Sequence, residues 1–209
     1  ATLTAEAMMN TQPWDYWEAA GTRLKARGPQ IRALLETALA VKPDHSGALH
    51  LYIHLMEASA DPKAAEPHAD RLAAQKSTAG HLAHMPGHIY HRIGRYADSI
   101  RVNRDAVAAD EALFTKVAQS GAYPTGYYPH NVHFILVGAQ MGGDGAMAIQ
   151  AADKLARLMK PVGRDIPAWV QAILAAPWLA RAQFAAPAEV LALPVQADAL
   201  PFVLGQQHY

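Results

Sequence analysis

Two pairs of histidines recur along the chain at a fixed interval. His50 and His54 are four residues apart, and His84 and His88 repeat this spacing 34 residues later. A period of this length indicates a repeat architecture, in which each repeat buries its apolar face only by stacking on its neighbours. The chain is therefore expected to fold as a stack of similar units.

The segments of the chain between turn signals are helical in character. They are alanine-rich and roughly 12–15 residues long, and strand-like alternation of apolar and polar residues is scarce. Glycine and proline separate them, as at Gly28-Pro29, Lys42-Pro43, Asp61-Pro62 and Gly142-Gly143. We therefore expect an all-α protein built from pairs of antiparallel helices.

The clearest repeat covers residues 80–113. Its distinctive features are a small and an aromatic residue in the first helix, a glycine turn, and small–apolar pairs in the second helix. These are Gly87 and Tyr90, then Gly94-Arg95-Tyr96, then Ser99-Ile100 and Ala106-Val107. In these features and in its period the chain resembles the tetratricopeptide repeat (TPR) family. The resemblance implies a TPR-type solenoid of antiparallel helix pairs, wound as a right-handed superhelix.

Applied to the whole chain, the same repeat period predicts a single TPR-like domain, residues 1–209. We expect a degenerate repeat at 1–45, repeats at 46–79, 80–113 and 129–160, an insertion loop at 111–128, and a degenerate repeat with the start of a further helix at 161–209. The chain is therefore expected to be part of a longer repeat array.

The composition excludes several classes of protein. Lys plus Arg and Asp plus Glu are 18 each, so no excess of positive charge is present to neutralise nucleic-acid phosphates. The absence of cysteine excludes disulfides, zinc fingers and thiolate nucleophiles. No apolar run reaches the roughly 18 residues of a membrane span. We expect neither a nucleic-acid partner nor a membrane span, and a cytoplasmic and a periplasmic location both stay open.

Histidine is the unusual residue of this chain, with 11 copies. Seven of them fall at matching positions of the first helix of successive repeats: His50, His54, His81, His84, His88, His130 and His133. Spacings of three, four and seven residues place side chains on one face of a helix. In the TPR family these positions face the concave groove, so the resemblance implies that the seven imidazoles converge there.

A group of this kind predicts a metal site. Imidazoles one turn apart on a helix can bind one ion together without bending the backbone. Histidines with one carboxylate, Glu57, suit copper, iron or zinc and not calcium or magnesium, which prefer oxygen ligands. We predict one or two transition metal ions per chain, with His91, Tyr127 and Tyr128 around the ligands or in the pocket. A peptide- or anion-binding groove and a purely structural polar network are the competing interpretations.

Several functions are compatible with such a site, and they include metal storage, delivery or sensing and a pH-sensing groove. The preferred one is a copper- or iron-dependent oxidoreductase acting on a small molecule, because histidines outnumber carboxylates. In a zinc-dependent hydrolase the ion would lower the pKa of a bound water to about 7, and Glu57 would be the catalytic base. A non-catalytic TPR scaffold would bind a peptide or partner protein in the groove. The histidine-rich segments are also similar to those of long bacterial TPR proteins, a resemblance that implies no particular reaction.

Overall fold

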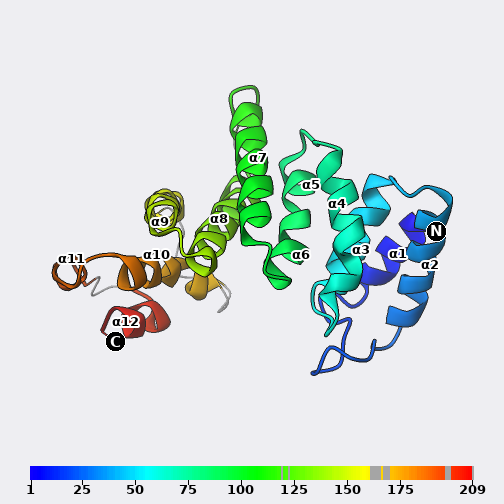
Figure 1. Ribbon diagram of the computed structural model, residues 1–209, viewed down its shortest axis with the longest axis horizontal. Helices are drawn as coiled ribbons and strands as arrows, with labels where there is room; N and C mark the ends of the chain where they lie inside the picture. Colours follow the sequence, from blue (N-terminus) through cyan, green and yellow to red (C-terminus); the bar gives the residue numbers. More distant parts are fainter. Residues whose placement is uncertain (119, 122, 161–165, 167–169, 196–198, 209) are drawn as a thin grey trace. The chain divides into compact units, whose positions relative to one another are not determined.

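The computed structural model of the protein describes residues 1–118, 120–121, 123–160, 166, 170–195 and 199–208 (Figure 1). Helices make up its regular structure, and this part of the chain contains no β-strand beyond an isolated bridge between Trp17 and Leu24. The predicted all-α class is therefore confirmed. Among these described helices, none combines the length and the apolar character needed to cross a membrane.

The chain divides into two compact units, Ala1–Ala106 and Val107–Tyr209. The sequence carries no break at this point, because the division falls inside one helix, α7 (Tyr96–Phe114). The first unit contains α1 (Thr2–Asn10), α2 (Gly28–Val41), α3 (Ser46–Met56), the 3-10 turn η1 (Pro62–Ala65), α4 (Glu66–Ala74), α5 (Gly80–His84) and α6 (Pro86–Arg92).

Helix α3 lies at the centre of the first unit. It packs against α2 on one side and α4 on the other, and α4 in turn packs against α6 (Figure 1). Leu49, Ile53 and Leu55 of α3 are fully buried, and burying a side chain of this size contributes about 1.5–3 kcal/mol. This packing fixes the rotation of α3, and with it the direction of the polar side chains that it carries.

The residues at the helix ends explain where the helices begin and stop. Helix α2 stops at Val41 because Lys42 precedes a proline and adopts a non-helical ψ of 87°. Helix α3 begins after His45, whose Nδ1 accepts a hydrogen bond from the backbone amide of Ala48 at 3.3 Å. At the turns that follow α6 and α8, Gly94 and Gly143 have φ values of +82° and +77°, which glycine adopts without strain.

Helices α5 and α6 are separated at a single residue, Met85. Pro86 lacks the amide hydrogen that would continue the helical hydrogen bonds, so one helix ends and the next begins there. Met85 nevertheless keeps right-handed helical angles, with φ −51° and ψ −40°. The break therefore leaves the side chains of α5 and α6 in helical phase.

The second unit contains a π-helical turn, η2 (Tyr123–Tyr127), and then α8 (Tyr128–Gly142), α9 (Gly145–Met159), α10 (Val170–Phe184), α11 (Pro187–Leu191) and α12 (Pro201–His208). Helix α9 packs against both α8 and α10, and α10 also contacts α12. The predicted repeat at 129–160 corresponds to α8 and α9, which form one helix pair.

The expected insertion loop at 111–128 is more helical than the sequence suggested. Residues 111–114 complete α7, and residues 123–128 belong to η2 and the start of α8. The reason lies in side-chain contacts of Glu111, whose carboxylate accepts a hydrogen bond from the Tyr128 hydroxyl at 2.7 Å and pairs with Lys154 at 2.5 Å. These contacts hold the end of α7 against the start of α8 and against α9.

Candidate metal centre

Helix α3 brings two of the predicted histidines together. His50 and His54 lie one turn apart, and their ring centroids are 4.8 Å apart in an edge-to-face arrangement. His54 is buried and His50 is half-buried. Because α3 is held in the core of the first unit, both imidazoles project from a fixed element.

Helices α5 and α6 supply three more histidines of the predicted set. His81 and His84 belong to α5, and His88 follows on α6. His84 is fully buried, whereas His81 and His88 are half-buried. The helical phase kept at Met85 places these residues on one face, as their spacings of three and four predict.

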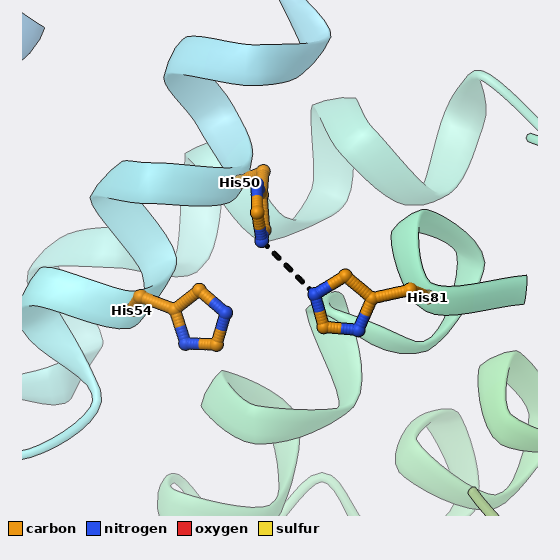
Figure 2. Close-up of side chains that lie close together, drawn as sticks. All are labelled: His50, His54 and His81. Atoms are coloured by element: carbon orange, nitrogen blue, oxygen red, sulfur yellow. Dashed lines mark hydrogen bonds between the residues drawn. The ribbon is translucent and has the colours of Figure 1, made fainter. Parts of the chain in front are cut away.

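Helix α3 and the segment formed by α5 and α6 contact each other through His50 and His81. Their Nε2 atoms lie 3.1 Å apart, and Figure 2 shows the two rings pointing toward one another, with a ring nitrogen of His54 turned toward them. One nitrogen from each of His50, His54 and His81 lies within 4.8 Å of the other two. The structure thus gathers three imidazoles from two predicted repeats into a group that could hold one metal ion.

Glu57 joins this group to His88. Its Oε1 accepts a hydrogen bond from Nδ1 of His54 at 2.9 Å, and its Oε2 lies 2.5 Å from Nδ1 of His88. Arg92 fixes the backbone here, since its guanidinium donates to the carbonyls of Glu57 at 2.7 Å and Ser59 at 3.1 Å. When Nδ1 of a neutral imidazole donates its hydrogen to a carboxylate, Nε2 carries the lone pair. Histidines that bind metals commonly have this arrangement.

His84 is oriented from the other side, by Asn103 of α7. Nδ1 of His84 lies 2.6 Å from Oδ1 of Asn103, and Nδ2 of Asn103 donates to the carbonyl of Ser99 at 2.8 Å. Nε2 of His84 lies 2.8 Å from Nε2 of His88. A continuous chain of contacts therefore runs from Asn103 through both histidines to Glu57 and on to His54.

The surroundings keep His50 and His81 neutral at physiological pH. Burial, reinforced by the charges of His54, His81 and His88, lowers the pKa of His50 to about 3. Burial and the charges of His54 and His88 lower the pKa of His81 to about 4. Neutral imidazole is the form that binds a metal ion.

Glu57, by contrast, must be ionised, because its carboxylate accepts hydrogen bonds from the imidazoles. Burial on its own would raise the pKa of this carboxyl. The charge of His88, together with hydrogen bonds from His54 and His88, outweighs burial and holds the pKa below its usual value. The site therefore combines the neutral imidazoles of His50 and His81 with one half-buried carboxylate, and both oxygens of this carboxylate contact histidines.

Two residues beside this group were not found by sequence reasoning. Asn103 is one, and its available signal was a polar residue beside the apolar residues Val102 and Ala106 of α7. Trp14 is the other: its ring centroid lies 5.0 Å from that of His54, its side chain is 68% exposed, and its φ is +66°. It lies in an irregular segment, where periodicity gives no information.

His91 lies on α6, one turn beyond His88. Its ring packs against Tyr96 with centroids 5.5 Å apart. Burial, followed by the charges of His88 and Arg92, lowers its pKa. It lies one turn beyond a residue of the candidate centre, and its role around the ligands stays a prediction.

The remaining predicted residues belong to the second unit. His130 and His133 are half-buried on the first turns of α8. Tyr127 stacks on Tyr123 with centroids 5.4 Å apart, and Tyr128 is buried against α7. That these four residues share a site with the histidines of the first unit stays a prediction.

Comparisons with known proteins give no further guide to the chemistry. The chain matches no protein-family model, no curated protein and no solved structure.

Proposed function

We propose that this protein binds a transition metal ion in its first unit, with His50, His54 and His81 as ligands. The observation that carries the proposal is the convergence of these three imidazoles, with one nitrogen of each within 4.8 Å of the others. Two nitrogens bound to one tetrahedral ion at about 2.0–2.1 Å lie about 3.3 Å apart. The Nε2 atoms of His50 and His81, at 3.1 Å, are close to that spacing.

The ligand set narrows the choice of metal. Imidazole nitrogen suits copper, iron and zinc, whereas calcium and magnesium require mostly oxygen ligands. The neutral state of His50 and His81, whose pKa values burial lowers to about 3 and about 4, favours any of the three transition metals. One ion per chain is the minimum, and the number of histidines allows two.

Within this proposal the protein is a copper- or iron-dependent oxidoreductase acting on a small molecule. Zinc-dependent hydrolysis would need Glu57 as a general base. Both oxygens of Glu57 already contact imidazoles, and its pKa is held below the usual value, so it would accept a proton from water poorly. Glu57 is better suited to orienting His54 and His88.

We propose a TPR-type solenoid as the architecture in which this site is built. The helix pair α8 and α9, the contacts between successive helices, and the left-handed glycines after α6 and α8 support this proposal. Such solenoids commonly bind peptides in their grooves. A peptide or partner protein is therefore the ligand to expect if the protein takes up no metal.

Reconstitution with metal tests the proposal directly. Tag-free protein is incubated with Cu(II), Fe(II) or Zn(II), desalted, and analysed by elemental mass spectrometry. Wild type should retain about one or two ions per chain, and His50→Gln/His81→Gln should lose at least one of them. His68→Gln is the matched control, because His68 packs against Tyr52 of α3, with ring centroids 4.6 Å apart, and lies outside the group.

A wild-type protein that stays free of all three metals would refute metal binding. The oxidoreductase part is tested separately, by oxygen consumption in the presence of ascorbate. Turnover by the copper or iron form that disappears in the double variant supports it. A zinc form that hydrolyses model esters, alongside inactive copper and iron forms, would favour the hydrolase instead.

A further inference from the structure

His84 and His88 form a second convergent pair beside the three-histidine group. Their Nε2 atoms lie 2.8 Å apart, and their ring centroids are 4.6 Å apart. The ring of His84 also stacks on that of His81, with centroids 6.0 Å apart. The pair therefore lies next to the group of His50, His54 and His81. Its two Nε2 atoms are separate from the three nitrogens that we assign to the first ion.

The tautomer of His84 follows from Asn103. The amide nitrogen of Asn103 donates to the carbonyl of Ser99 at 2.8 Å, which identifies the other amide atom as the oxygen. That oxygen can only accept, so Nδ1 of His84, 2.6 Å away, carries the hydrogen. In the neutral ring Nε2 then has a lone pair, and this lone pair faces His88.

The tautomer of His88 follows from Glu57. An ionised carboxylate accepts hydrogen bonds and cannot donate, so Nδ1 of His88 is the donor across its 2.5 Å contact with Oε2. Nε2 of neutral His88 therefore also has a lone pair, directed at His84. Two lone pairs at 2.8 Å repel each other, and a cation or a shared proton between or beside the two nitrogens removes this repulsion.

We propose that His84 and His88 hold a second transition metal ion, next to the one bound by His50, His54 and His81. This inference rests on the proposed function, since it assumes the first ion. Both rings have Nδ1 bound to an oxygen acceptor, and this leaves both Nε2 atoms available for one ion, whereas a shared proton is the competing occupant that a copper titration tests. The contact of Nδ1 with an oxygen acceptor is the outer-shell arrangement that fixes the tautomer of metal-binding histidines.

Glu57 connects the two ions in this arrangement. Its Oε1 orients His54 of the first site and its Oε2 orients His88 of the second. With two ligands from this pair, the second ion keeps open coordination positions, which a catalytic ion needs for substrate or water. Two adjacent ions can also hold one small ligand, such as hydroxide, between them. The second site is therefore the weaker one and the one that meets the substrate.

A copper titration of the wild type tests the second site without any variant. Cu(II) is added to metal-free protein, with bound copper measured by elemental analysis and electron paramagnetic resonance. We expect uptake in two steps, to about two ions per chain. The spectrum of the first ion should broaden or disappear as the second binds, because neighbouring Cu(II) ions couple magnetically.

Matched variants locate the two sites. His84→Gln should bind about one ion per chain and show an uncoupled Cu(II) spectrum at all ratios, whereas His50→Gln should lose the first, tighter step. His88→Gln serves if the burial of His84 prevents that variant from folding, as judged by circular dichroism. His68→Gln should behave as wild type.

The outcomes separate the second site from the proposed function. A wild type that saturates at one ion, with His84→Gln unchanged, would overturn the second site and leave the first standing; the histidine pair would then share a proton. Two ions that both persist in His84→Gln and in His88→Gln would also overturn it. A wild type that binds no copper, iron or zinc would refute the proposed function as well.

Discussion

Nδ1 of His54 lies 2.9 Å from Oε1 of Glu57, three residues later in the chain. Glu57 is the residue at which α3 ends, and Arg92 holds its carbonyl in place at 2.7 Å. The carboxylate thus fixes the ring of one candidate ligand from a position that is itself fixed. Several measurable consequences follow from this contact and from those around it.

Replacing Glu57 by glutamine should weaken metal binding about 10–100-fold, because the amide keeps one acceptor oxygen in place of two and has no charge, so one of His54 and His88 loses the acceptor that orients it. Competition with a chromogenic chelator measures the change in affinity. Glu36→Gln is the control, since Glu36 pairs with Arg32 on α2 and lies outside the site. Unaltered affinity in Glu57→Gln, with loss of hydrolytic activity alone, would show instead that Glu57 is a catalytic base.

The metal-free protein should lose stability as the pH falls below about 6.5. His50 and His81 have folded-state pKa values of about 3 and about 4, so the unfolded chain binds more protons than the folded one in this range. Stability therefore decreases as pH falls, and the lowered pKa of Glu57 acts in the same direction below about pH 4.5. From pH 7 to pH 5 the free energy of unfolding should drop by about 2 kcal/mol per histidine, or about 4 kcal/mol for the two.

Urea denaturation at a series of pH values measures this loss. His50→Gln/His81→Gln should show a flatter pH dependence, because its two replaced side chains do not titrate. An equal slope in wild type and double variant would mean that other groups dominate the acid response.

Gly87→Ala should damage both the fold and the site. A Cβ at residue 87 would lie 2.5 Å from Nδ2 of Asn103, the residue that orients His84. Overpacking of this kind costs about 1–3 kcal/mol, and displacement of Asn103 should also reduce copper affinity. Gly94→Ala is the matched comparison, because its cost arises from a φ of +82° with no atom within 4 Å of the added Cβ.

The two glycine variants are compared by thermal melting and copper titration. Both should melt at lower temperature than wild type, and Gly87→Ala alone should bind copper more weakly. Equal copper affinities in the two variants would show that Asn103 does not position His84.

Trp14 should report metal binding by fluorescence. Its ring contacts that of His54, with centroids 5.0 Å apart, and Cu(II) quenches nearby indoles. Titration with Cu(II) should therefore quench part of the emission of the chain's four tryptophans. Trp14→Phe should remove most of this quenching while keeping the stoichiometry of binding, and quenching that persists in the variant would place the ion closer to another tryptophan.

The sequence was a good guide to the class of fold and to the grouping of histidines in the first unit. Helical spacing predicts that His50 and His54 share a face, and that His81, His84 and His88 share another. Both groupings hold because α3 is locked in the core and Met85 keeps helical angles across the break at Pro86.

Other features depended on contacts that periodicity does not encode. Repeat equivalence pairs His50 with His84, yet the Nε2 contact of His50 is with His81, one turn earlier, because the offset between stacked helices is set by side-chain packing. Asn103 comes from α7, 19 residues after His84. The helical ends of the 111–128 segment depend on Glu111 and its contacts with Tyr128 and Lys154.

The contact between His50 and His81 spans the junction of two predicted repeats, near residue 79. Repeat arrays evolve by gaining and losing whole units, because each unit mainly contacts its neighbours. At most junctions such an event changes only the length of the array. In the proposed repeat array, inserting one unit between α4 and α5 would separate the imidazoles of α3 from those of α5 and α6. Selection for the proposed site would therefore keep the number of units at this junction constant.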